Sequence, residues 1–116
     1  MEKIGVVTVT YNSSEVIDKF LEDVFNQKFP IFFLYVVDNA STDNSLEKIN
    51  KLKESRLKII KNSINKGVAS ANNKGIASAL KDNCSHILLL NNDVEFGDNL
   101  FEILINSIRS DKYSLV

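Results

Sequence analysis

Oxygen-bearing side chains follow three aliphatic stretches of this sequence, at the residues where each stretch stops. Residues 87–90 (ILLL) run into NNDVE at 91–95, residues 4–9 run into TYN at 10–12, and residues 32–37 run into DNAS at 38–41. Carboxylate and amide oxygens are hard donors that suit Mg²⁺ or Mn²⁺, and few protein ligands leave room for phosphate oxygens around such an ion. The pattern predicts a divalent-metal site with Asp93 as its ligand, and Glu95 is a second candidate.

Other site chemistries lack the residues that they need. The segment TYNSS after the first aliphatic stretch contains no glycine, so neither a dinucleotide fingerprint nor a P-loop is present. One His and one Cys cannot form a zinc cluster. No nucleophile elbow or Ser-His-Asp order is visible.

Hydrophobic periodicity alternates between strand-like and helix-like stretches along the chain. Strands are predicted at 4–10, 32–37, 57–60 and 87–90, and the last of these is predicted to be buried on both faces. Helices are predicted at 15–26, capped by Ser13 or Ser14, then after a cap at Thr42 or Ser41, at 67–80, and from Asp98 or Asn99 to 108. This order predicts a three-layer α/β/α fold with a mainly parallel sheet.

Residues 113–116 read as the beginning of a fifth strand. A complete domain seldom stops at such a point. We therefore expect residues 1–116 to be the N-terminal part of a larger domain.

In an open parallel sheet, ligands bind beyond the carboxyl ends of the strands. The polar segments at 10–12, 38–41 and 91–95 are expected to meet at that edge. Each segment also has a purely structural interpretation. Residues 38–43 suit an Asx turn with a helix cap, Gly67 suits a turn with positive φ, Asn72 and Asn73 suit a solvent-facing helix surface, and His86 suits a structural role.

Composition excludes several classes of partner. The 116 residues carry a net charge of −1, which gives no general attraction to nucleic acid or anionic lipid. No apolar run approaches the roughly 20 residues that a membrane-spanning helix needs. The lone Cys84 rules out an internal disulfide, and the N-terminus shows no signal-peptide pattern, so a cytoplasmic location is expected.

Four ordered motifs resemble the inverting glycosyltransferases of family 2, which have the nucleotide-sugar-binding GT-A fold. They are VVTVTYN, VVDNASTDNS, NKGVASANNKGI and ILLLNNDVE, and the last resembles the rhamnosyltransferase-like branch. The resemblance implies a nucleotide-sugar donor, such as a UDP or dTDP sugar, and a saccharide or lipid-linked saccharide acceptor. It implies cell-envelope polysaccharide synthesis, with a longer protein at the inner face of the membrane. It places the donor against Thr10, Tyr11, Asn12, Asp38, Gly67, Asn73 (less securely, or Asn72), Asn91 and Asp93.

The sequence departs from the family pattern in two ways. The first aspartate of the Asp-x-Asp motif is Asn91, which can still donate to or accept from a ribose hydroxyl but removes one charge from the metal site. The catalytic base of the family comes from the later half of the domain, so it is expected beyond Val116. The chain is therefore predicted to hold donor-binding residues without complete catalysis.

A phosphoacceptor or regulatory α/β domain is the alternative from another class. In that interpretation, Asp38 or Asp93 accepts a phosphoryl group or binds Mg²⁺. A receiver-like domain needs an acidic cluster after the first strand, where Thr10-Tyr11-Asn12 stands instead.

Overall fold

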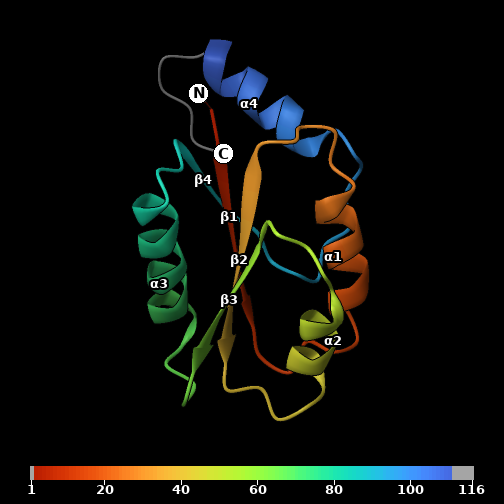
Figure 1. Cartoon of the computed structure of the whole chain (residues 1–116), viewed down its shortest axis with the longest axis vertical. Coiled ribbons are helices and arrows are strands. Elements are labelled where there is room, and N and C mark those ends of the chain that lie inside the picture. Colours follow the sequence, from red (N-terminus) through yellow and green to blue (C-terminus); the bar gives the residue numbers. More distant parts are fainter. Residues whose placement is uncertain (1, 111–116) are drawn as a thin grey trace.

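The computed structural model describes residues 2–110, which form a four-stranded parallel sheet between two layers of helices (Figure 1). The strand order is β3-β2-β1-β4. The predicted α/β architecture is therefore confirmed, whereas the strand predicted at 113–116 lies outside the described residues. The elements are β1 (Ile4–Thr10), α1 (Ile17–Phe25), β2 (Phe32–Asn39), α2 (Ser45–Lys51), β3 (Leu57–Asn62), α3 (Val68–Lys81), β4 (His86–Leu89) and α4 (Leu100–Ser110).

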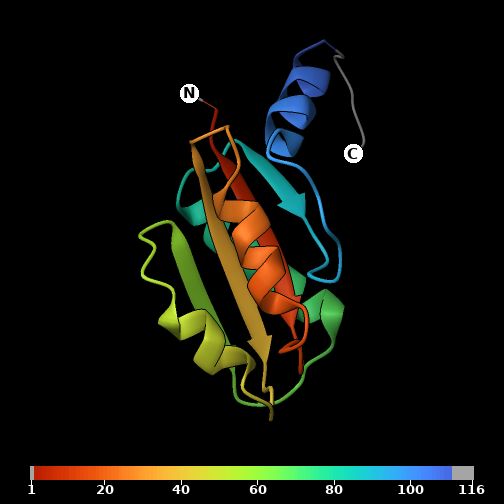
Figure 2. The ribbon, with the colours of Figure 1, turned by 90° about the vertical axis from the view of Figure 1, so that its right-hand side faces the viewer.

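The two faces of the sheet bury separate cores. On one face, α1, α2 and α4 cover the larger core, which includes Phe20, Phe32 and Phe101. On the other face, α3 covers a smaller core around Val7 and Tyr35. Figure 1 shows α1 and α2 together on one side of the sheet and α3 on the opposite side, and in Figure 2 α3 lies behind the sheet. Burial on both faces explains why the strands are nearly continuous apolar runs.

Helix α3 packs closely on the sheet because its buried face is made of small residues. Ala71, Gly75 and Ala79 are buried at intervals of four residues, so they lie on one face of the helix. A Cβ on Gly75 would come within 2.4 Å of Val7 Cγ1. Val68 and Leu80 do not contribute to this packing, because these side chains are 64% and 59% exposed. They lie away from the small face that meets the sheet.

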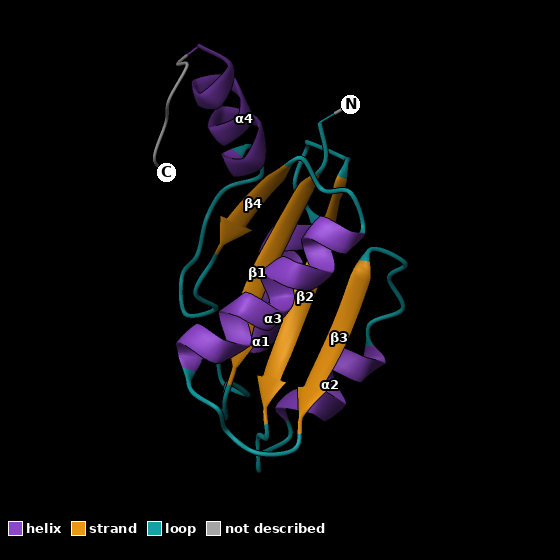
Figure 3. Ribbon diagram, turned by 90° about the vertical axis from the view of Figure 1, so that its left-hand side faces the viewer, coloured by secondary structure: helices purple, strands orange, loops and turns teal. Residues whose placement is uncertain are grey.

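The carboxyl edge of the sheet is stepped. Thr10 of β1 pairs with Asp38 of β2, and β2 continues to Asn39, which pairs with Asn62 of β3. In contrast, β4 pairs with β1 only as far as Leu89 opposite Val7. Figure 3 shows four parallel arrows of which β4 stops short of the others. The segment after β4 therefore starts level with the interior of β1.

The prediction that the fourth strand is buried on both faces is wrong. Among the described residues β4 pairs with β1 alone and lies at an edge of the sheet. Leu89 is 50% exposed, although Leu88 packs against the larger core. A run of apolar residues in the sequence indicates a strand, but it does not indicate whether that strand has a neighbour on both sides.

The predicted caps of the first two helices are also wrong. The residues before α1 and α2 are Val16 and Asn44, and neither makes a side-chain capping bond. Ser13 instead accepts from the Tyr11 amide through Oγ at 3.3 Å, and Ser41 Oγ donates to Asp38 Oδ1 at 2.6 Å. These hydroxyls are used by loop contacts at the carboxyl edge, so both helices begin later than predicted.

Candidate functional site

Asp38 lies at the centre of a buried polar network where β1 and β2 end. Its side chain is 1% exposed. Oδ1 accepts from Thr10 Oγ1 at 2.7 Å and from Ser41 Oγ at 2.6 Å, and Oδ2 accepts from the Ser41 amide at 3.0 Å. The last bond closes the Asx-type turn that the residue types predicted. Asp38 therefore fixes the end of β1 to the loop that follows β2.

Asn12 fastens the same loop from the other side. It has φ +51°, a left-handed conformation that Asn tolerates better than most residues. Its Oδ1 accepts from the amides of Thr42 at 2.8 Å and Asp43 at 3.3 Å, and its own amide donates to Ser41 Oγ at 2.9 Å. The structure thus brings the predicted residues Thr10, Asn12 and Asp38 into one network.

Asp43 links this loop to the first turn of α2. Its Oδ1 accepts from the Ser45 amide at 2.9 Å and from Ser45 Oγ at 2.5 Å, and its Oδ2 accepts from the Ser14 amide at 3.1 Å. The hydrogen bond from Ser45 lowers the pKa of the Asp43 carboxyl from 3.8 to about 2. Asp43 is therefore charged throughout the physiological pH range.

A chain of amides connects Gly67 to β2 and β3. Asn39 Nδ2 donates to the Gly67 carbonyl at 3.1 Å, and Asn62 Nδ2 donates to Asn39 Oδ1 at 2.8 Å. Lys74 Nζ completes the chain by donating to Asn62 Oδ1 at 2.6 Å. Gly67 has φ +85°, as its predicted turn requires. The first turn of α3 is therefore held at the same sheet edge as Asp38.

The segment after β4 places its carboxylates outside the Asp38 network. Asp93, Glu95 and Asn91 are all exposed. Asn92 anchors the segment to β1, since its Nδ2 donates to the Val9 carbonyl at 2.7 Å. Asp93 and Glu95 line a hollow of about 100 Å³ together with Glu15, Val16, Lys19, Asn92 and Val94. The two carboxylates therefore border the same hollow.

Two of the predicted residues stand apart. Tyr11 is 51% exposed at the end of β1. Asn73 is exposed on α3, one residue before Lys74. Within residues 2–110, neither side chain makes a hydrogen bond or ion pair with another predicted site residue.

The donor set around Asp93 fits a hard divalent cation that keeps most of its ligands for water and phosphate. Within residues 2–110, no group of three or more His, Cys, Asp or Glu gathers into a complete metal cage. Asp93, Glu95 and Asn91 are exposed oxygen-bearing side chains within one segment of five residues. Mg²⁺ is usually bound in this way, by one or two carboxylates plus substrate phosphates.

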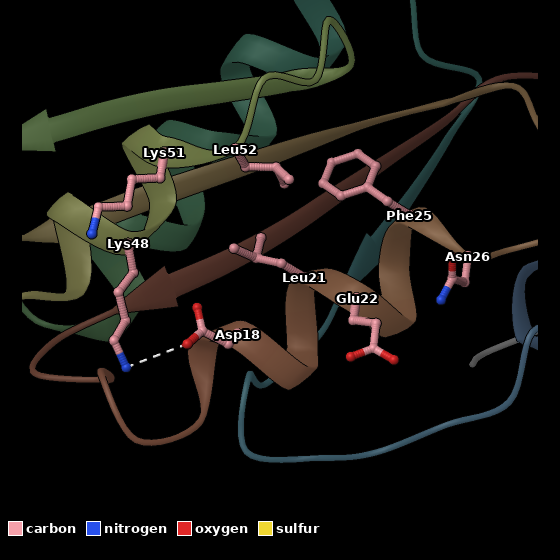
Figure 4. A pocket seen from close by; sticks show the side chains of 8 residues that line it. All are labelled: Asp18, Leu21, Glu22, Phe25, Asn26, Lys48, Lys51 and Leu52. Carbon is pink, nitrogen blue, oxygen red and sulfur yellow. Dashed lines mark ion pairs between the residues drawn. The ribbon is translucent and has the colours of Figure 1, made fainter.

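Another hollow lies elsewhere, between α1 and α2. It has a volume of about 420 Å³ and is lined by Leu21, Phe25 and Leu52 with several charged side chains at its rim (Figure 4). Lys48 at this rim donates to the Ser14 carbonyl at 2.7 Å and pairs with Asp18 at 3.4 Å. Because its cations already pair within the chain, this hollow offers less to an anionic ligand than the carboxyl edge does.

Sequence reasoning assigned no site role to Asn39, Asn62 or Lys74, and it treated Ser41 only as a possible helix cap. Ser41 and Asn39 follow Asp38 directly, and Asn62 ends β3. Their signal was the same as that of Asp38, a polar residue directly after an apolar strand. The contribution of Lys74 could not be predicted, because it depends on how α3 lies over β3.

The fold and this site define a parallel α/β domain whose candidate ligand-binding residues lie beyond the carboxyl ends of β1, β2 and β4. Residues 5–116 match the family model of Glycosyl transferase family 2. The chain belongs to glycosyl transferase family 2.

Two relatives of known name show the same relationship over part of the chain. The chain is 34% identical over 67 residues to the UDP-Glc:alpha-D-GlcNAc-diphosphoundecaprenol beta-1,3-glucosyltransferase WfaP of Escherichia coli. The aligned region covers 58% of this chain and 27% of that protein. It is 33% identical over 69 residues to the poly(ribitol-phosphate) beta-glucosyltransferase of Bacillus spizizenii, covering 56% of this chain and 11% of that protein. The matched part is thus about a quarter or less of these relatives' length.

Solved structures of longer glycosyltransferases contain this fold. S. aureus TarS in complex with UDP-GlcNAc has a TM-score of 0.80 at 24% identity, over 93% of this chain and 31% of that one. A mannosyltransferase from Pyrobaculum calidifontis in complex with GDP-Man and Mn²⁺ has a TM-score of 0.67 at 22% identity, over 81% of this chain and 28% of that one. The predicted GT-A fold is confirmed. None of these findings bears on the rhamnosyltransferase-like branch, which stays a prediction.

Within residues 2–110, no helix is both long enough and apolar enough to span a membrane.

Proposed function

We propose that residues 1–116 are the donor-binding part of an inverting glycosyltransferase that moves a sugar from a nucleoside diphosphate to an acceptor hydroxyl. The observation that carries the proposal is the placing of Thr10, Asn12, Asp38 and Gly67 in connected networks at one sheet edge. Asp93 follows the neighbouring strand end. In a parallel sheet, this edge is where ligands bind.

Asp38 forms the floor of the proposed nucleoside site. A carboxylate offers about four lone-pair positions, and the chain itself uses three of them. The remaining position on Oδ2 accepts a hydrogen bond from a base N–H or a ribose hydroxyl. Thr10, Tyr11 and Asn12 form the wall beside it, and Gly67 and Asn73 approach from α3.

Asp93 and Asn91 face the diphosphate and ribose in this proposal. A divalent cation held by Asp93 supplies charge neutralisation for the diphosphate leaving group. The exposed Glu95 is a second carboxylate on the same hollow as Asp93. Asn91 donates to or accepts from a donor hydroxyl without adding charge.

The proposed reaction is an in-line displacement with inversion. The acceptor oxygen forms a bond to the anomeric carbon while the bond from that carbon to the diphosphate oxygen breaks. The acceptor proton passes to a carboxylate base, which we place beyond Val116, and the nucleoside diphosphate leaves with the bonding electron pair. Holding donor and acceptor in line is the main contribution that a protein makes to such a step.

The relatives favour particular partners. The E. coli relative's name specifies UDP-Glc and a diphosphoundecaprenol-linked sugar, and the Bacillus relative's name specifies poly(ribitol-phosphate). We propose a UDP or dTDP sugar as donor, and a saccharide or lipid-linked saccharide of the cell envelope as acceptor. A location in the cytoplasm, at the inner face of the membrane for the longer protein, agrees with such an acceptor.

Calorimetric titration with UDP and dTDP, each with and without Mn²⁺, tests the proposal. Asp38→Ala is expected to weaken nucleotide binding under both conditions, whereas Asp93→Ala removes only the gain that Mn²⁺ provides. Glu102→Ala removes an exposed carboxylate on α4 and serves as the matched control. Nucleotide binding that neither Asp38→Ala nor Asp93→Ala changes would exclude the assignment.

A further inference from the structure

The Asp93 loop, residues 90–99, is fastened at two points with its carboxylates between them. The first point is Asn92, whose Nδ2 donates to the Val9 carbonyl at 2.7 Å. The second lies four residues later at Phe96, whose amide donates to Asp23 Oδ2 at 3.3 Å. Asp93 and Glu95 lie between these points, and their side chains make no hydrogen bond or ion pair with the described residues. The direction of both carboxylates therefore depends on how the two ends are held.

Gln27 supplies most of the second attachment. Its Nε2 donates to the Gly97 carbonyl at 2.6 Å and to the Asp23 carbonyl at 3.1 Å, while its Oε1 accepts from the Phe101 amide at 2.9 Å. The residues that it joins are about 70 positions apart in the chain. One amide side chain thus ties the end of α1 to both the Asp93 loop and the start of α4.

Both attaching side chains are buried polar groups. Asp23 and Gln27 are each 7% exposed. Burying such groups is unfavourable unless their hydrogen bonds are satisfied, and here the partners are backbone groups of residues 96, 97 and 101. Asp23 Oδ1 pairs with Lys19 Nζ at 2.9 Å, and the hydrogen bond to Asp23 raises the pKa of the lysine. A leucine at either position would fill the core without directing the loop.

We infer that Asp23 and Gln27 form a clamp, called the α1 clamp below, that positions the Asp93 loop for binding of a metal-bound nucleoside diphosphate. This inference rests on the proposed function, because it takes Asp93 as the residue that meets the diphosphate. Neither clamp residue touches the donor. They act through the backbone at residues 96–101, as residues behind a metal ligand commonly do.

The test separates positioning from stability. Gln27→Met keeps the side-chain volume but removes all three hydrogen bonds, and Asp23→Leu removes the acceptor for the Phe96 amide. Asp23→Asn keeps an acceptor oxygen. Tyr35→Phe is the stability control, because it deletes the partly buried hydrogen bond from Tyr35 Oη to Asp82 Oδ2 at 2.7 Å on the α3 side of the sheet.

Two measurements are made on each variant. Hydrogen exchange read by mass spectrometry is expected to rise in residues 91–97 of Gln27→Met and Asp23→Leu, with no rise there in Tyr35→Phe. UDP affinity in Mn²⁺ is expected to fall about 10-fold in the same two variants, the size that outer residues of metal sites typically show. Affinity without Mn²⁺ should stay within about twofold, and Asp23→Asn should recover most of the loss.

The outcomes remain distinguishable. Unchanged exchange in residues 91–97 overturns the clamp, and so does a loss of UDP affinity no larger than that of Tyr35→Phe. A parent protein that binds neither UDP nor dTDP overturns the proposed function instead. In that case the exchange measurement still decides whether the clamp holds the loop.

Discussion

Asp38 and Asp93 both lie at strand ends, but they differ in their burial and in their hydrogen bonds. Asp38 is 1% exposed and accepts three hydrogen bonds from Thr10 and Ser41. Asp93 is exposed and makes no hydrogen bond or ion pair with the described residues. Removing a buried acceptor leaves its donors unsatisfied, whereas removing an exposed carboxylate does not. At the residue scale, Asp38 therefore supports the fold as well as the proposed nucleoside site, whereas Asp93 is expected to serve ligand binding without supporting the fold.

Asp38→Ala is expected to lower the free energy of unfolding by about 2–3 kcal/mol, because it leaves the Thr10 hydroxyl and the Ser41 amide and hydroxyl without their acceptor. Asp93→Ala is expected to change it by no more than about 0.5 kcal/mol, as exposed substitutions usually do. Urea unfolding followed by circular dichroism measures both values. Equal losses in the two variants would contradict the division of roles.

Asp43 gives the protein a pH-dependent contribution to stability. Its pKa is lowered from 3.8 to about 2 in the folded chain, chiefly by the hydrogen bond from Ser45. A depressed carboxyl pKa stabilises the fold above the unfolded pKa, and this stabilisation is lost as pH falls through the folded pKa. We therefore expect the stability difference between the parent and Asp43→Asn to be full above about pH 4 and to shrink towards pH 2. Urea unfolding at closely spaced pH values measures it, and a difference independent of pH would refute the linkage. Glu102→Gln is the control for general loss of negative charge.

At the element scale, the sequence predicted the strands and turns that a short stretch of neighbouring residues determines by itself. The run of β-branched residues at 4–10 coincides with β1, and the turn at Gly67 begins α3 as predicted. The starts of α1 and α2 were misplaced because the Ser13 and Ser41 hydroxyl groups do not cap these helices. They form hydrogen bonds with the Tyr11 amide and with Asp38 Oδ1 instead. These contacts are as local as a helix cap, since they span two and three residues, so the residue types alone do not show which of the two a hydroxyl group makes.

The candidate site was likewise only partly predictable from the sequence. The positions of Asp38 and Asp93 at one sheet edge followed from the parallel fold alone, and the family motifs added Gly67. The amide chain through Asn39, Asn62 and Lys74 did not follow, because it depends on the register of β2 with β3. Sequence periodicity predicts that strands are present but does not predict which side chains their register places together.

Gly75 tests how closely α3 lies on the sheet. Gly75→Ala would favour the helix by about 1 kcal/mol in isolation. The new Cβ, however, would lie 2.4 Å from Val7 Cγ1 on a β-branched side chain of β1 that has little freedom to move. We expect a net loss of about 1–2 kcal/mol in the free energy of unfolding, from overpacking.

Gly97→Ala is the matched control for this prediction. Its Cβ would meet only Asn99 Oδ1, at the ordinary distance of 3.6 Å. We expect its free energy of unfolding to stay within about 0.5 kcal/mol of the parent, as for most surface changes. A Gly75→Ala protein as stable as Gly97→Ala would show that α3 can move away from β1 at little cost.

At the scale of the whole molecule, the helices are attached to the sheet to different degrees. Helix α3 buries small residues along its length, from Ala71 to Ala79. Helix α4 buries Phe101 and Ile105 but leaves Ile103 51% exposed. Figures 1 and 2 show α4 at the end of the sheet where β1 begins, away from α2. The two-sided core thus holds the strands and α3 more firmly than the far end of α4.

We expect the amides of residues 105–109 to exchange through local opening, at a lower free energy than those of β2. The first turn of α4 is held by Gln27 and by the packing of Phe101 on Phe32, with ring centroids 5.1 Å apart. Its last turn is held by the exposed ion pair between Arg109 and Glu2, and exposed pairs contribute about 0–1 kcal/mol. Native-state hydrogen exchange in increasing urea measures this, because local openings expose little surface and depend weakly on urea. The α3 amides between Ala71 and Ala79 are the control and should follow β2, and α4 amides with the same urea dependence as β2 would place α4 in the global cooperative unit instead.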